Sequence, residues 1–189
     1  ASKGIKDELI YWSHWMLERG WLHESMTPVS DNNKNGFDYE NLIEVTEAKY
    51  LKFSTGKRLN IQRNYPSSES KHLATLYSKD LHGLFTGDLV SNQVHLWLGD
   101  GVSSSGVENW QKTLNEIIRR YNGRKINIYP GHGEPGSLNI LKDNMEYIDI
   151  FKFVIKTSAD KDTAINKMKM LFPNYKEAGL LPFGVEQHL

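Results

Sequence analysis

"LFTGDLVSNQVHLWLGDG", Leu84 to Gly101, and "INIYPGHGEPG", Ile126 to Gly136, are the two stretches of sequence that decide the fold. Each begins with a short apolar run that predicts a buried strand, and each run leads to a glycine beside a residue that can bind metal or transfer protons. Those residues are Asp88 and His132. Functional carboxylates and imidazoles are often held at strand ends, where rigid elements aim them into a shared crevice. The plain alternatives are an aspartate that caps a turn and a histidine on a surface loop.

The remaining sequence predicts one domain, residues 1–189, of alternating helices and strands. Amphipathic spacing and stop residues predict the helices, and short alternating runs predict the strands. The order helix, four strands, helix, strand, helix, helix indicates a layered α/β or α+β domain. We expect helices over 6–21, 106–123, 137–156 and 160–173, a hairpin over 49–64 that turns near Thr55 and Gly56, strands over 72–77, 83–88 and 126–129, a polar loop over 30–36, and an irregular tail or half-turn over 177–189.

The amino-acid composition limits the classes of binding partner that we expect. Lys plus Arg and Asp plus Glu are balanced at 23 each, so nothing favours nucleic acid or an anionic membrane surface as a partner. No apolar run approaches the length of a membrane span, and no signal peptide is visible. The sequence has no cysteine, which excludes disulfides and thiolate metal sites. The compartment stays open, with a cytoplasmic location as the working expectation.

In their order and spacing, the two motifs resemble the C-terminal half of the metallo-β-lactamase superfamily. The resemblance covers residue 49 to the end of the sequence and implies a portion of an αββα sandwich. It implies that Asp88 is the carboxylate that bridges two metal ions and that His132 is the last histidine ligand. Zinc is the metal implied, with two ions in the complete site, and manganese or iron are possible.

A third ligand is implied at Glu69, in the turn "SES", Ser68 to Ser70. The superfamily usually has a histidine at this turn. The alkylsulfatase-like branch has a glutamate there, and the turn in this sequence resembles that variant. A carboxylate oxygen is a suitable ligand for Zn²⁺, Mn²⁺ or Fe²⁺. The alternative for Glu69 is a solvated turn residue, and nearby His72 is expected to be structural or to support a ligand.

The sequence departs from the family in lacking the signature His-x-His-x-Asp-His. We therefore expect either the C-terminal portion of a longer protein or a relative that has lost its metal site, and the first is favoured. Half of the fold would expose one face of its sheet, so a missing N-terminal half or a second copy should cover that face. None of the seven histidines has the signature spacing: His14, His23, His72, His82, His95, His132 and His188.

The resemblance implies a hydrolase in which a metal-bound hydroxide cleaves an ester, lactone, thioester or sulfate ester of a small molecule. His95, in "VHLWL", falls in a segment that many of these hydrolases carry near the mouth of the site, so it is a candidate for substrate contact. The plain alternative is a histidine in a loop beside Trp97. The competing function is a metal-free binding or structural module that retains the scaffold without catalysis.

Overall fold

The computed structural model describes residues 49–189 throughout and, before them, residues 11, 13, 14, 16–20, 23, 34 and 36. The chain divides into two compact units, Ala1–Ala48 and Lys49–Leu189. In the first unit, the described residues between 11 and 18 are helical, as predicted for the helix over 6–21. The rest of that predicted helix and most of the polar loop over 30–36 lie outside the described residues. The fold below is that of the second unit.

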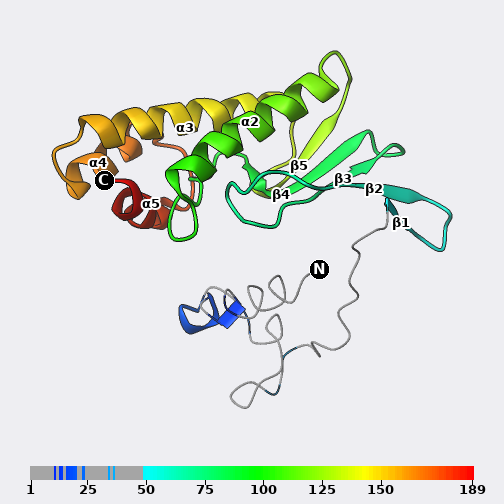
Figure 1. The fold of residues 1–189 in the computed structure, drawn as a ribbon, viewed down its shortest axis with the longest axis horizontal. Helices are drawn as coiled ribbons and strands as arrows, with labels where there is room; N and C mark the ends of the chain where they lie inside the picture. The colour runs from blue at the N-terminus through cyan, green and yellow to red at the C-terminus, as the bar shows by residue number, and fades with distance from the viewer. Residues whose placement is uncertain are drawn as a thin grey trace. The chain divides into compact units, whose positions relative to one another are not determined.

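One five-stranded sheet underlies the second unit (Figure 1). Its strands follow one another across the sheet in chain order; the first three pairs are antiparallel and the last pair is parallel. A parallel pair needs a crossover, which helix α2 (Ser104–Tyr121) provides. The predicted hairpin is confirmed, with Gly56 at a φ of 81° in its turn. The strands are β1 (Tyr50–Lys52), β2 (Arg58–Gln62), β3 (Thr75–Ser78), β4 (Gly83–Ser91) and β5 (Asn127–His132).

The strand register assigns alternate residues to the two faces of the sheet. Leu84 pairs with Ile128, and both are fully buried in the core that also contains Trp110 of α2. The next pair, Phe85 with Tyr129, therefore points to the opposite face, where the two rings stack at 4.6 Å between centroids. Helices α2 and α3 (Asn139–Thr157) lie side by side along the first face (Figure 1).

Helix α2 has the amphipathic pattern that the sequence predicts, with Trp110, Leu114 and Ile117 all fully buried. The Ser103 hydroxyl caps its first turn by accepting a hydrogen bond from the Gly106 amide at 3.1 Å. The helix ends just before Gly123, whose φ of 73° suits a chain reversal that other residues adopt only with strain. Among the described residues, no helix is both long and apolar enough to cross a membrane.

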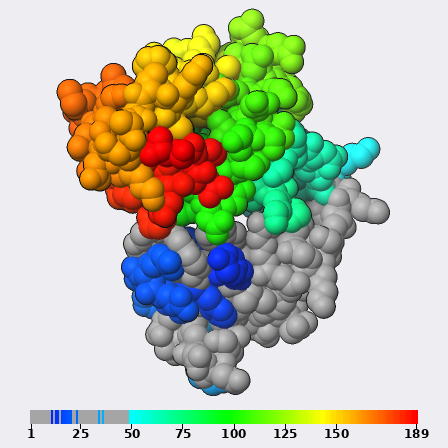
Figure 2. All heavy atoms as spheres, turned by 60° about the vertical axis from the view of Figure 1, so that its left-hand side comes forward, coloured from blue at the N-terminus to red at the C-terminus, as the bar shows by residue number. Residues whose placement is uncertain are grey.

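The C-terminal region contains more helix than the sequence predicts. Helix α4 (Lys161–Leu171) begins at a cap formed by Asp160, and the predicted irregular tail is instead a 3₁₀ turn, η3 (Ala178–Leu180), followed by α5 (Leu181–His188). Packing explains the difference, because Gly184 lets α5 approach the Leu98 side chain closely. Figure 2 shows red α5 at the surface, between orange α4 and the green segment that leads into α2.

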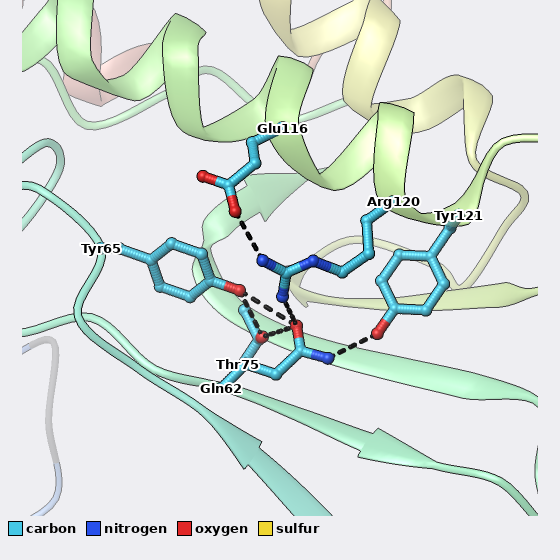
Figure 3. A network of polar contacts seen from close by, with 6 residues as sticks. All are labelled: Gln62, Tyr65, Thr75, Glu116, Arg120 and Tyr121. Atoms are coloured by element: carbon cyan, nitrogen blue, oxygen red, sulfur yellow. Dashed lines mark hydrogen bonds and ion pairs between the residues drawn. The ribbon is translucent and has the colours of Figure 1, made fainter.

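A polar network joins the C-terminal end of α2 to strands β2 and β3 (Figure 3). The Gln62 carboxamide is at its centre: Nε2 donates to the Tyr121 hydroxyl at 2.6 Å, and Oε1 accepts from Arg120 at 2.8 Å. Tyr65 and Thr75 bond to each other at 2.9 Å and both reach Gln62 Oε1. Partly buried polar groups need such partners, so the network gives α2 a fixed register on β2 and β3.

Candidate metal centre at the β4 and β5 strand ends

Asp88 lies inside β4, where the strand is irregular. The β4–β5 ladder shifts register on both sides of Gly87, and Gly87 has a φ of 54°. Such a bulge kinks the strand and re-aims the side chains next to it. The sequence predicts a strand that stops at Asp88; the structure instead continues β4 to Ser91, so the carboxylate projects from a bulge with more than half of its side chain exposed.

His132 is the last residue of β5, which is longer than the predicted strand over 126–129. It pairs with Ser91, the last residue of β4. The loop that follows folds back at once: Ile128 and Gly136 exchange two backbone hydrogen bonds, of 2.7 and 3.0 Å. His132 is therefore held on a short closed loop, residues 129–135, and not on a free surface turn.

The glycines on either side of His132 are required by close backbone packing. A Cβ atom at Gly131 would lie 2.1 Å from Asp88 Oδ1, and one at Gly133 would lie 2.0 Å from the carbonyl oxygen of Asn92. Gly133 also has a φ of 84°, which side-chain-bearing residues rarely adopt. The Gly-His-Gly sequence thus allows the His132 loop to lie directly against the end of β4.

Together these features bring the two side chains into contact. Asp88 Oδ1 lies 3.4 Å from His132 Nε2, and each side chain is 58% exposed. The hydrogen bond to Asp88 raises the pKa of His132, the negative charges of Asp88, Glu177 and Glu69 raise it further, and partial burial opposes the rise. The site is an exposed acid–imidazole pair in a negative local potential.

Glu69 lies in the connection between β2 and β3, where the resemblance places a ligand, and it is half-buried. Its charge influences His132, but more weakly than that of Glu177. Glu177 was not singled out from the sequence, because it falls in the tail that was expected to be irregular. The backbone next to it is tied to the segment that follows β4: the Lys176 amide donates to Gln93 O, and the His95 amide donates to Lys176 O, both at 3.0 Å.

The Asp88–His132 geometry fits two ligands of one metal ion. In a tetrahedral zinc site, ligand atoms at about 2.0–2.2 Å from the ion lie about 3.3–3.6 Å from each other. The observed 3.4 Å is within this range. Over residues 49–189 and the few described before them, no three His, Asp or Glu side chains gather closely enough to hold an ion. A complete metal site at this pair would need further ligands.

His95 lies in the core and not at the mouth of a site. Its side chain is buried, with 1% of the residue exposed, and Nδ1 lies 2.9 Å from the Tyr147 hydroxyl. The rings of Tyr147, Phe172 and Tyr175 surround it. Burial, aided by the charge of Lys169, lowers the pKa of His95 to about 4. A neutral, enclosed imidazole has no surface to offer a substrate in this structure.

Two further residues support the site and were missed in the sequence. Trp110 Nε1 donates to Leu89 O at 2.8 Å, which fixes β4 immediately after Asp88. The Asn144 side chain, on α3, bonds to both the N–H and the C=O of Ser91. Neither contact has a local sequence signal, because each joins segments that are distant in the chain. A tryptophan or asparagine within an amphipathic helix predicts burial at most.

Comparison with known proteins supports the fold. No protein-family model matches the sequence, and no curated protein does. Among solved structures, a metallo-β-lactamase family protein, TTHA1429 from Thermus thermophilus, is similar with a TM-score of 0.58 and 14% identity, over 95% of this chain and 58% of that one. A double mutant of the sec-alkyl sulfatase PisA1 is similar with a TM-score of 0.52 and 14% identity, over 75% of this chain and 26% of that one.

The chain spans only part of the length of its structural neighbours, and it covers 58% of TTHA1429. Another solved structure, that of VMB-1, matches 56% of this chain with a TM-score of 0.44 and 20% identity, and the match covers 46% of VMB-1. At such identities the likeness concerns the fold alone. The predicted mixed α/β architecture, with a sheet covered by helices, is confirmed by the structure and by its neighbours. The chain has a fold of the metallo-β-lactamase type.

Proposed function

We propose that this protein is, or is part of, a metal-dependent hydrolase whose metal centre includes Asp88 and His132. The observation that carries the proposal is their meeting at 3.4 Å, from two strands whose pairing is irregular on both sides of Gly87. An irregular strand and glycines that admit no side chain are costly features, and such features concentrate at functional sites.

In this proposal Asp88 and His132 are metal ligands, and Glu69 is a further ligand or a neighbour of one. A bound zinc ion, or manganese or iron, would supply Lewis acidity toward the scissile bond and toward a water molecule. Asp88 has a second carboxylate oxygen available to orient that water and to accept its hydrogen bond. His132 must be neutral at Nε2 to bind metal, so the ion competes with the proton that Asp88 stabilises. The remaining ligands would come from outside the described residues.

The substrate class is an ester, lactone, thioester or sulfate ester of a small molecule. The "SES" turn at Glu69 and the fold similarity to the sec-alkyl sulfatase PisA1 make secondary alkyl sulfates the first class to test. We also propose that another part of the protein or a second copy covers the sheet face that carries Phe85 and Tyr129.

The second candidate function is a metal-free module. It is favoured by the absence of a three-ligand cluster in the part of the chain that the structure describes. In that case the contact between Asp88 and His132 is an exposed ion pair that holds the loop against β4.

Hydrolysis assays on the zinc-loaded and manganese-loaded protein distinguish the two functions. The substrates are a secondary alkyl sulfate, an aryl ester, an acyl lactone and a thioester. We expect metal-dependent turnover of at least one substrate, with Asp88→Ala reducing kcat/KM by about 100-fold or more. Asp80→Ala, which removes an exposed turn carboxylate at the other end of β4, is the matched control. Turnover that survives in Asp88→Ala, or none with any substrate, would reject the hydrolase.

A further inference from the structure

A set of amide contacts connects helix α3 to the end of β4. Asn144 is 3% exposed, and its side chain makes a two-way bond with one residue: Oδ1 accepts from the Ser91 amide at 2.9 Å, and Nδ2 donates to Ser91 O at 2.6 Å. Nδ2 also donates to Ile140 O at 3.0 Å, within α3. The buried carboxamide thus has partners for its donor and its acceptor, and it ties the Ser91 backbone to the helix.

The next residue, Asn92, holds the loop of His132 on both sides of the imidazole. Its amide donates to His132 O at 2.9 Å, and its side-chain Nδ2 donates to Glu134 O at 2.7 Å. Between these two bonds, its own carbonyl oxygen packs against Gly133 with no room for a Cβ atom. One residue therefore contacts three consecutive positions of the loop, 132 to 134.

Regular strand pairing does not provide this positioning. The β4–β5 ladder is interrupted between Gly87 and Ser91, which is the interval that contains Asp88. Across a broken ladder, the distance between Asp88 and His132 depends on the contacts where pairing resumes. Pairing resumes where Ser91 meets His132, with the Asn92 amide donating to His132 O, and the Asn92 side chain adds its bond to Glu134 O.

We propose that Asn92, anchored from α3 through Ser91 by Asn144, is the positioning residue that sets the separation of Asp88 and His132. An asparagine that only formed a turn would bond to its own segment about two residues further on. The Asn92 side chain instead bonds to Glu134 O, a partner distant in the chain.

The direct test is the distance itself. Crystal structures of the protein with Asn92→Ala and with Asn92→Asp, which keeps the size but removes the Nδ2 donor, are compared with the unsubstituted protein. We expect the Asp88 Oδ1 to His132 Nε2 distance to increase by about 1 Å or more, or the loop to become disordered. Asn115→Ala, an exposed asparagine on α2, should leave the distance unchanged. A distance that stays near 3.4 Å in both Asn92 variants overturns the proposal.

Amide hydrogen exchange gives a second readout, which does not require crystals. In Asn92→Ala the Gly136 amide, which closes the loop by donating to Ile128 O, should exchange about tenfold faster or more. The amides within α2 should exchange at the original rate, which shows that the variant is folded. Unchanged exchange at Gly136 counts against the proposal as strongly as an unchanged distance.

The consequence for metal binding rests on the proposed function. Residues that orient ligands typically alter metal affinity by about 10- to 100-fold. We therefore expect Asn92→Ala to weaken zinc binding by this factor in a chelator competition, with Asn115→Ala unaffected. If the variant binds zinc as tightly as the unsubstituted protein, the positioning role is wrong. If the unsubstituted protein binds no zinc, the proposed function fails, and the distance and exchange measurements alone decide on Asn92.

Discussion

Two histidines that follow β4 in the chain have opposite environments. His132 is 58% exposed at its side chain, lies between two glycines and contacts a carboxylate. His95 is 1% exposed, and aromatic rings and a tyrosine hydroxyl surround it. Asp88 raises the pKa of His132, whereas burial lowers the pKa of His95 to about 4. His132 is thus an exposed imidazole whose protonated form the neighbouring carboxylate stabilises, and His95 is a packing residue that is neutral near neutral pH.

The difference shows which sequence context distinguishes an exposed histidine from a packed one. His95 is flanked by Val94 and Leu96, both buried, in a run that is largely apolar. His132 is flanked by glycines whose missing side chains make room for β4. A backbone that has to approach another closely is a stronger functional signal than a histidine within an apolar run.

The largest effect is expected at Gly133. Gly133→Ala should destabilise the protein by about 3–4 kcal/mol, because it combines a strained φ with a clash against the Asn92 backbone that displaces the loop. Urea unfolding measures the loss. Gly123→Ala is the matched control, since its φ is also positive, at 73°, but nothing lies within 4 Å of the added Cβ; it should cost only about 1 kcal/mol. Equal losses in the two variants would refute the packing account of the His132 loop.

The second largest effect expected is a loss of stability in acid, caused by the buried His95. The folded-state pKa of His95 is about 4, below an unfolded value of about 6.5, so stability is highest above pH 6.5 and falls as the pH drops toward 4. At about 1.36 kcal/mol per pH unit the full loss is about 3 kcal/mol. Urea unfolding at several pH values should show this loss in the protein but not in His95→Phe, which retains an aromatic ring without a titrating group. Identical pH dependence in both would mean that His95 is already solvated.

The exposed pair should have the smallest effect on stability. The folded-state pKa of His132 is raised, so its stabilising contribution is present below the unfolded pKa and disappears as the pH rises through the folded value. Because both side chains are largely solvated, the contribution should stay below about 1 kcal/mol. Asp88→Asn should therefore destabilise the protein slightly more at about pH 5.5 than at about pH 8.5. A difference that grows with pH would contradict the assignment of the pair.

Local sequence patterns predicted the strands, the hairpin and the amphipathic helices, since periodicity and stop residues act over a few positions. They also singled out Asp88 and His132 as candidates from the glycines beside them, but they did not predict that β4 continues past Asp88 to Ser91. The supporting residues Asn92, Asn144 and Trp110 could not be predicted, because their partners are distant in the chain. The C-terminal helix α5 was missed because packing against Leu98, and not its own weak pattern, stabilises it.

The most direct test of the central claim is a zinc dissociation constant, measured by chelator competition for the protein, for Asp88→Ala, for His132→Ala and for the double variant. If the two side chains hold one ion, each single substitution should weaken binding strongly, and the double variant should be little weaker than either single one. The control Asp80→Ala should bind as the unsubstituted protein does. Zinc affinity that is unchanged in Asp88→Ala or in His132→Ala would contradict a shared metal centre.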